Sequence, residues 1–442
     1  MNRVERVKEI ERRLGKRKLV WFGTRGVDAE PLTALRQFSE SFCLTAPLDS
    51  MLADAGTCLE SLKKRRVDTD CYSLEGDPSM EARHLERHLG ASLDETSAVV
   101  VYWPSGFFSS IYFPRRGTIE YLGLLREQQA AFEHKPWVET ELRKVGVKVT
   151  PWEYWRCGDQ KRLAEALRHA PLVLRRNRSE GGEGFVLVRE PNDIPEGWPP
   201  AQDGFFGAAP LLEPNVPVNV NACVFPDGST SLHAPSVQLI GIRSCTRKTF
   251  GHCGNDFARV RDLGPEVLND LEAMTRSVGT WLSGMGYVGA FGVDAIWRQG
   301  ELYLCEVNPR FQGSSAIAAR AARDLGRSDI FLDHISAFLN LPAPPSISLW
   351  ELARHQPRIS QVLPRNTSPY PTRRCAEGLS KQPLNQMAML PADDVEVDLG
   401  GVLFKMIVEE SVTEDGHSLA EPYGELAQRC ASQLFSPVGP EG

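Results

Sequence analysis

The chain has 442 residues, of which 42% are hydrophobic and 24% are charged, as expected for a globular protein of two or three domains. Fifty Lys and Arg residues against 57 Asp and Glu residues give a net charge of −7, and the sequence has no basic block that would follow a phosphate backbone. The composition therefore disfavours general nucleic-acid binding.

The first twenty residues alternate both charge signs and contain no apolar stretch long enough for a secretory signal or a membrane-spanning helix. We therefore expect a cytoplasmic protein with no membrane partner. The ten cysteines show no Cys-x-x-Cys spacing, which favours reduced thiols over a zinc site or a disulfide framework.

Residues 1–130 have the pattern of an α/β domain of the doubly wound type. An apolar run predicts a buried strand at 18–22, and the spacing of apolar residues over 32–38 predicts a helix after the Gly-rich turn that follows it. A second buried strand is expected at 99–103 and an amphipathic helix at 120–133.

Arg25 and Asp28 follow the first of these strands. Doubly wound folds place ligands at the carboxyl ends of their strands, so both residues are candidate substrate contacts. Helix capping is the alternative role for Asp28.

Alternating helices and strands are expected after residue 130. In chain order they are a helix ending at 142, a strand at 145–152, a helix at 160–169, strands at 171–176 and 185–188, a hinge at 191–210, strands at 216–225 and 231–240, a helix at 267–281 that ends at Gly284 or Gly286, and a linker at 342–348.

Residues 286–315 carry the most informative pattern, a predicted β-hairpin with Asp294 on one strand and Glu306 and Asn308 on the other. A three-residue turn over 299–301 would place Asp294 directly opposite Glu306, so that two carboxylates and an amide oxygen converge. Such an oxygen-only set suits Mg²⁺, and Mn²⁺ is an alternative. A two-residue turn would put Asp294 on the other face, and an ordinary surface hairpin is the alternative to a metal site.

Arg310 lies two residues beyond Asn308 and would share its face. A guanidinium there suits a catalytic role toward a transferring phosphoryl group, and a salt bridge at the rim is the alternative. Gly313 and Ser314 open an Ala-rich helix whose N-terminus would face an anion beside Arg310, so both are candidate substrate contacts. Plain N-capping is the alternative for the serine.

A Gly-rich turn between the strands at 171–176 and 185–188 can fold over phosphates with its backbone amides, and neighbouring cations support this interpretation. The candidate nucleotide contacts of this region are Gly181, Gly182, Gly184, Lys135, Arg175 and Arg176. Farther along, a basic loop offers Arg243 as a second catalytic candidate and Arg247, beside Lys248, as a candidate substrate contact; exposed loop charge is the alternative for each.

Together these residues resemble the ATP-grasp superfamily, specifically its carboxylate–amine ligases. The resemblance is carried by Lys135, by Arg175 nine residues before Gly184, and by the D…E-x-N-P-R pattern that ends at Arg310. The position of Arg175 is usually Lys in this superfamily, which leaves Arg176 as an alternative. In the segment 211–220 the resemblance implies an adenine contact near Glu213 and suggests Asn219 for the ribose.

The resemblance implies a pre-ATP-grasp α/β domain at 1–130, a central lobe with the Gly-rich flap at 131–205, a C-terminal lobe with the metal site at 206–341, and a linker with a small extension at 342–442. The segments GTRGVDAEPL, FEHKPWVE and QLIGIR…FGHCGNDF are similar to the pheganomycin-type peptide ligases.

The activity that this resemblance implies is ATP-dependent amide or peptide bond formation in specialised metabolism. ATP would convert a carboxylate into an acylphosphate, with two Mg²⁺ ions at Asp294, Glu306 and Asn308, and an amine from an amino acid or peptide would displace phosphate. A homodimer is compatible with this activity. The alternatives are an ATP-grasp kinase that releases a phosphorylated small molecule and a nucleotide-binding regulator.

Overall fold

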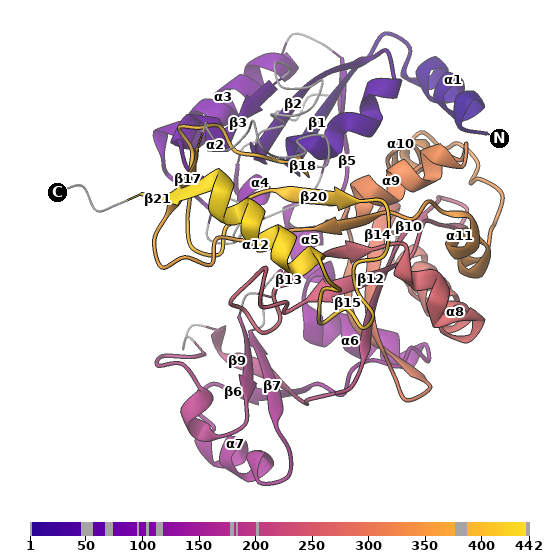
Figure 1. Ribbon diagram of the computed structural model, residues 1–442. Helices are drawn as coiled ribbons and strands as arrows, with labels where there is room; N and C mark the ends of the chain where they lie inside the picture. The colour runs from indigo at the N-terminus through magenta and orange to yellow at the C-terminus, as the bar shows by residue number, and fades with distance from the viewer. Residues whose placement is uncertain are drawn as a thin grey trace.

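The computed structural model describes residues 2–45, 56–66, 74–94, 97–102, 106–111, 118–176, 181–182, 184–199, 203–375 and 387–438. Figure 1 shows the N-terminal unit at one end of the molecule and the lobe that carries α7 (Gln160–Leu167) at the other, with a large sheet between them. No helix in the described ranges combines the length and the apolar character needed to cross a membrane.

The N-terminal unit is built on a parallel sheet in the order β3-β2-β1-β4-β5. Leu19 and Trp21 of the central strand join one buried cluster, whereas Val20 and Phe22 join another, so both faces of the sheet are covered. The expected doubly wound α/β architecture is confirmed. The elements of this unit are α1 (Arg3–Leu14), β1 (Lys18–Arg25), the 3₁₀ helix η1 (Gly26–Ala34), β2 (Phe38–Thr45), β3 (Gly56–Cys58), α2 (Leu59–Lys63), α3 (Met80–Asp94), β4 (Ala98–Tyr102), α4 (Gly106–Ser110), β5 (Ile119–Leu122) and α5 (Arg126–Phe132).

Two helices expected in this unit are wrong in part. The chain after β1 forms η1, and Phe38 begins β2 instead of continuing a helix. The start of the helix expected over 120–133 belongs to β5, and only Arg126–Phe132 is helical. In both places pairing with a buried neighbouring strand overrides the local helical spacing. Residue 103 lies outside the described residues.

The middle lobe is an antiparallel sheet in the order β6-β9-β7-β8. Its elements are α6 (Lys135–Lys144), β6 (Glu153–Arg156), α7, β7 (Leu172–Arg176), β8 (Phe185–Val188), η2 (Pro191–Asp193) and β9 (Phe205–Pro210). The two strands expected beside the Gly-rich turn pair as β7 and β8, with Arg175 opposite Phe185. Positions 177–180 and 183 of that turn lie outside the described residues.

Two expectations for the middle lobe are wrong. Residues 145–152 make one isolated bridge, from Val149 to Leu304, instead of a strand. The expected hinge at 191–210 contains β9, which lies between β6 and β7 because its apolar residues fill the interior of the lobe. Composition rich in Pro and Gly concealed that strand.

The C-terminal lobe is a nine-stranded sheet in the order β15-β14-β10-β12-β13-β16-β20-β18, with β11 paired to β10. Its strands are β10 (Val216–Val224), β11 (Thr230–Leu232), β12 (Ser236–Ile240), β13 (His252–Asp256), β14 (Gly289–Arg298), β15 (Glu301–Asn308), β16 (Ser360–Val362), β18 (Met387–Ala388) and β20 (Lys405–Val408). Its helices are η4 (Arg259–Leu263), α8 (Pro265–Gly284), α9 (Ser315–Asp324) and α10 (Ile330–Phe338). The helix expected to end at Gly284 or Gly286 is confirmed as α8, whose apolar stripe packs with β10, β14 and β15.

The segment after residue 341 is an integral part of this architecture. Its strands β16, β20 and β18 complete the nine-stranded sheet, and it adds α11 (Leu349–His355), α12 (Tyr423–Leu434) and a small sheet of β19 (Glu396–Val397), β17 (Thr372–Arg374) and β21 (Phe435–Pro437). It also contacts the N-terminal unit, where the fully buried Arg66 donates to the carbonyls of Met389 and Val402 at 2.8 and 2.9 Å. The segment after residue 341 therefore links the N-terminal unit to the C-terminal lobe.

Candidate active site

A cavity of about 380 Å³ lies between the middle lobe and the nine-stranded sheet. Both lobes and the connection between β9 and β10 contribute to its wall. Its lining includes Thr150, Trp152, Arg175, Gly181, Gly182, Leu211, Glu213, Asn219, Gln238, Phe250, His252, Asp294, Cys305, Glu306, Asn308, Arg310, Gln312, Gly313, Ser314 and Arg365.

The β14–β15 hairpin brings Asp294 directly opposite Glu306, as the sequence predicts, but the predicted three-residue turn is wrong. Arg298 pairs with Glu301, which leaves a two-residue turn in which Gln299 and Gly300 have φ angles of 51° and 80°. Positive φ at both positions is typical of the tight turn that matches the twist of a hairpin.

A β-bulge restores the register that the short turn would have lost. Ala295 pairs with Leu304 and Asp294 with Glu306, so Cys305 is the additional residue. The backbone of Leu304 is held from its other side, since its N–H donates to Lys148 and its carbonyl accepts from Thr150, both at 2.8 Å. The bulge therefore keeps the two carboxylates and Asn308 on the wall of one cavity.

Asp294 lies among amide side chains. Its carboxylate accepts from Asn219 at 2.6 Å, from Asn308 at 3.0 Å, and from Gln238 and Gln312 at 3.1 Å. Burial raises the pKa of Asp294 to about 6, and the charge of Glu306 contributes in the same direction while the amide hydrogen bonds oppose it. A cation between the two carboxylates would relieve this repulsion.

Glu306 forms an ion pair with Lys135, the first residue of α6. Burial by itself would raise the pKa of Glu306, but the charge and hydrogen bond of Lys135, with the charge of Arg310, lower it. Lys135, expected to contact nucleotide, therefore lies at the predicted metal site.

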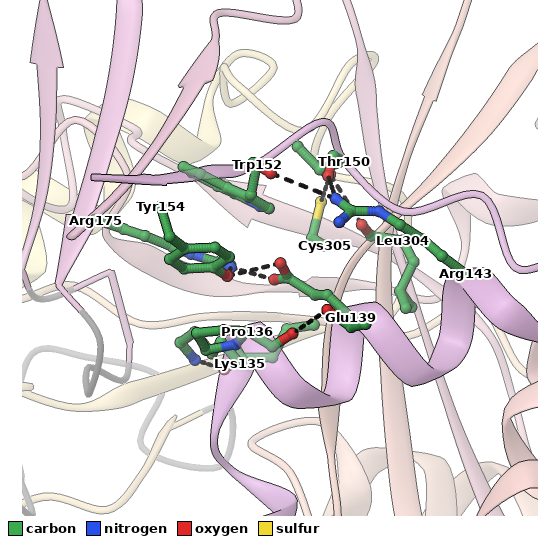
Figure 2. Close-up of polar contacts among 12 residues, drawn as sticks. Lys135, Pro136, Glu139, Arg143, Thr150, Trp152, Tyr154, Arg175, Leu304 and Cys305 are labelled. Atoms are coloured by element: carbon green, nitrogen blue, oxygen red, sulfur yellow. Dashed lines mark hydrogen bonds and ion pairs between the residues drawn. The ribbon is translucent and has the colours of Figure 1, made fainter. Parts of the chain in front are cut away.

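The structure distinguishes the two candidate arginines of β7. Arg175 lines the cavity, and its guanidinium bonds Glu139 and Tyr154 beside the ring of Trp152, as Figure 2 shows. Arg176 points elsewhere and pairs with Asp203 at 2.7 and 3.0 Å. Gly184 packs against the Arg176 side chain and is absent from the described cavity wall, unlike Gly181 and Gly182.

Arg310, Gly313 and Ser314 line the same cavity as Asn308. The Nε of Arg310 lies 3.4 Å from a carboxylate oxygen of Glu133. Ser314 donates to the side-chain oxygen of Asn219 at 2.7 Å, which places the start of α9 beside Asp294. The predicted convergence at the end of the hairpin is therefore present.

Arg25 and Asp28 form an ion pair of 2.8 Å at the carboxyl end of β1. Arg25 also donates to the carbonyl of Gln312 at 3.4 Å, next to Gly313. Both residues therefore lie at the end of the strand, as expected. Arg25 contacts a residue of the cavity wall, and Asp28 is fully buried.

Two expected groups lie away from the site. Arg243 and Arg247 are exposed, neither lines the cavity, and Arg243 donates to the backbone carbonyl of Arg247 at 3.3 Å. Their catalytic and substrate-binding assignments are not supported, because the loop presents Thr249 and Phe250 to the cavity instead. Asn219, in contrast, lines the cavity and pairs with Asp294 on the neighbouring strand, and its contact with the ribose stays a prediction.

Several cavity residues were missed at the sequence level. Gln238, Gln312, His252 and Arg365 line the wall, although none was a candidate site residue. Gln238 and His252 lie in the segments that are similar to the peptide ligases, and Gln312 continues the i, i+2 spacing of Asn308 and Arg310. Burial and the charges of Arg365 and Arg25 lower the pKa of His252 to about 4.

The donor set fits a hard divalent cation. In the part of the chain that the structure describes, no group of three or more His, Cys, Asp or Glu side chains is placed to hold a metal. Asp294, Glu306 and Asn308 instead offer two carboxylates and one amide on the cavity wall. Mg²⁺ is bound in proteins by one or two carboxylates, with phosphate and water as the other ligands.

Known proteins resemble this chain in part of its sequence and in its fold. Residues 235–314 match the profile of an ATP-grasp domain. The chain is 23% identical over 209 residues to the formate-dependent phosphoribosylglycinamide formyltransferase of Oleidesulfovibrio alaskensis, covering 46% of this chain and 48% of that protein. The chain thus spans about half the length of the curated relatives it matches.

Two solved structures share the fold. The ADP complex of N5-carboxyaminoimidazole synthetase from Staphylococcus aureus aligns with a TM-score of 0.54 and 14% identity over 95% of this chain and 98% of that chain. A biotin carboxylase complex from Campylobacter jejuni aligns with a TM-score of 0.57 and 14% identity over 90% of this chain and 89% of that chain. Residues 235–314 thus match an ATP-grasp domain, and the fold of the chain is shared with these two structures.

Proposed function

We propose that this protein is an ATP-dependent carboxylate–amine ligase that forms an amide or peptide bond. One observation carries the proposal: Asp294 and Glu306 face each other on the wall of a cavity that Arg175 and Arg310 also line. This arrangement has the charges required to bind a metal-bound triphosphate next to a second substrate.

The similar proteins support ATP and a carboxylate as substrates. Two of the fold relatives were solved with ADP or an ATP analogue. The curated relatives are named as formate-dependent formyltransferases, and formate is a carboxylate.

Asp294, Glu306 and Asn308 would hold Mg²⁺. When bound there, the ion supplies positive charge to the β- and γ-phosphates. Lys135 and Arg175 bind the phosphates as fixed cations, and Arg310 stabilises the charge on the phosphoryl group that is transferred. The connection at Leu211–Glu213 provides the adenine contacts.

The reaction then has two steps. An oxygen of the substrate carboxylate attacks the γ-phosphorus, the bond to the β-phosphate oxygen breaks, and ADP leaves. The amine nitrogen next attacks the acyl carbon, phosphate leaves with the electron pair of the C–O bond, and the nitrogen loses a proton. No enzyme nucleophile is required.

The carboxylate is proposed to bind at Gly313 and Ser314, with Arg25 and its partner Asp28 behind them. These residues adjoin Arg310, so an acid bound there is next to the phosphoryl group. The amine is proposed to be an amino acid or a peptide.

The test is a mass-spectrometric screen of acids paired with amino acids and peptides, with Mg²⁺ and ATP. A ligase yields ADP, phosphate and a condensed product that requires the amine. An acid or alcohol that yields ADP and a stable phosphorylated product without an amine indicates a kinase. Wild-type protein that binds neither ATP nor ADP would refute both enzymatic functions.

A further inference from the structure

One face of α6 binds three different parts of the active-site lobes, and Figure 2 shows Lys135, Glu139 and Arg143 along that helix. Lys135 pairs with Glu306 of the hairpin, Glu139 pairs with Arg175 of β7, and Arg143 donates to the carbonyl of Thr150 at 3.2 Å. These positions are separated by four residues, so they lie on one side of the helix. The pair of Glu139 with Arg175 is of special interest, because the proposed reaction gives Arg175 a role and Glu139 none.

The guanidinium of Arg175 is held by hydrogen bonds from one nitrogen, Nη2, and by an aromatic ring that packs against it. Its Nη2 donates to Glu139 and, at 2.6 Å, to the hydroxyl of Tyr154, which in turn donates to the other Glu139 oxygen at 2.6 Å. The guanidinium carbon lies 4.0 Å from the centre of the Trp152 ring. Arg175 and Glu139 side chains are only 2% and 5% exposed, so both charges depend on this pairing.

Another part of the same guanidinium has no protein partner. The Nε of Arg175 is buried without a hydrogen bond to any described residue, although the side chain lines the cavity. A buried donor without a partner is costly, so the guanidinium of Arg175 retains unused hydrogen-bonding capacity beside the cavity.

The surrounding backbone is shaped for an arginine. Gly207 pairs with Arg175 across the sheet, and a Cβ atom at Gly207 would lie 3.2 Å from Cγ and 3.3 Å from Nε of Arg175. Glycine thus leaves the space that the arginine stem occupies. Glu139 itself lies outside the main cavity wall, so its effect on a ligand must pass through Arg175.

We propose that Glu139 and Tyr154 are positioning residues that fix Arg175, so that its guanidinium receives a phosphate of the nucleotide in the cavity. The inference rests on the proposed function, since it requires a nucleotide in this cavity. It also explains how an arginine serves at a position where the sequence resemblance leads one to expect lysine: the long planar group is held in one orientation by a carboxylate, a phenol and an aromatic face.

The test compares binding of Mg²⁺-ADP and of adenosine by calorimetry in wild-type protein, Glu139→Gln and Tyr154→Phe. Because Glu139 acts on phosphate only, we expect Glu139→Gln to weaken ADP binding about tenfold or more and to leave adenosine binding within about twofold. Tyr154→Phe should show the same selectivity to a smaller degree, and Glu139→Asp should recover part of the ADP affinity.

The matched control is Glu141→Gln on the same helix, since Glu141 pairs with Lys144 at the surface. It should bind both ligands as the wild type does. A second comparison places Glu139→Gln in an Arg175→Met background, where it should cause little additional loss because its only route to the ligand is gone.

The outcomes separate this inference from the proposed function. Wild-type protein that fails to bind ADP overturns both. Wild-type protein that binds ADP, with Glu139→Gln and Tyr154→Phe binding it equally well, overturns only the positioning role. Equal loss of ADP and adenosine affinity, or full additivity with Arg175→Met, also overturns it, because a general structural role would produce those results. If Glu139→Gln does not fold, Tyr154→Phe decides.

Discussion

Asp294 and Glu306 are direct partners across the β14–β15 hairpin even though the turn between their strands has only two residues. The bulge at Cys305 supplies the residue that the turn lacks, and the outer edge of the bulge is fixed by the pairing of Leu304 with Lys148 and Thr150. The geometry of the proposed metal site therefore depends on a local irregularity as much as on the two acids.

Replacing Glu306 by Gln should lower ATP turnover by about 100-fold or more while the fold persists, because the variant loses a carboxylate that would hold the Mg²⁺ needed in phosphoryl transfer. The control is Glu301→Gln, an acid on the same strand that pairs with Lys148 at the surface. Steady-state turnover at saturating Mg²⁺, with circular dichroism for folding, provides the measurement. Equal turnover of Glu306→Gln and wild type would remove the metal-site assignment.

Asn308→Ala should raise the Mg²⁺ concentration required for half-maximal turnover. Asn308 supplies the amide of the proposed ligand set and also donates to Asp294 at 3.0 Å, so its loss removes one metal donor and one hydrogen bond. Titration of activity with Mg²⁺ measures the effect. An unchanged Mg²⁺ requirement would show that Asn308 is not a ligand.

Gly182→Ala should weaken nucleotide binding. Gly182 has a φ of +83°, and an added Cβ would lie 2.1 Å from the carbonyl oxygen of Phe250. Alanine would therefore push Gly182 away from Phe250, and both residues line the cavity. We expect the affinity for Mg²⁺-ADP to fall about tenfold with little change in melting temperature. Gly146→Ala, at a positive-φ glycine with open space around it, controls for backbone strain alone.

Lys405→Met should stabilise the protein at pH 7. Burial lowers the pKa of Lys405 from 10.5 to about 8, and the charge of Asp28 opposes the shift. Below pH 8 the folded state therefore buries a positive charge that the unfolded state keeps in water, which lowers the free energy of unfolding. Between pH 8 and 10.5 the unfolded chain binds more protons, so this group's contribution to stability rises with pH. The variant should gain about 1–3 kcal/mol at pH 7, and the gain should shrink above pH 8. Urea unfolding at pH 7 and pH 9.5 tests the sign; a gain that grows with pH would contradict it, and Lys161→Met is the exposed control.

Local patterns predicted the fold class, the pairing of Asp294 with Glu306 and the strands on both sides of the Gly-rich turn, because alternation of side chains along a strand is visible in the sequence. The turn length was wrong, since a two-residue turn with a bulge gives the same pairing as a three-residue turn without one. Sequence patterns do not separate these possibilities.

Contacts between distant segments were beyond prediction. Glu139 reaches Arg175 across 36 positions, and Lys135 reaches Glu306 across 171. Arg243 and Arg247 looked like site residues on charge alone, but the loop that carries them directs Thr249 and Phe250 to the cavity. The segment after residue 341 looked like a small extension because its strands are too short to be recognised singly.

Trapping with hydroxylamine tests the central claim most directly. The protein is incubated with Mg²⁺, ATP and an acid found in the condensation screen, without any amine substrate, and the hydroxamate is measured for wild type and Arg310→Ala. Because a carboxylate is a poor acyl donor until it is phosphorylated, we predict ATP-dependent hydroxamate from the wild type and at least about 100-fold less from Arg310→Ala. Amide formation in the presence of the amine, without any hydroxamate or ADP release in its absence, would contradict an acylphosphate formed before amine attack.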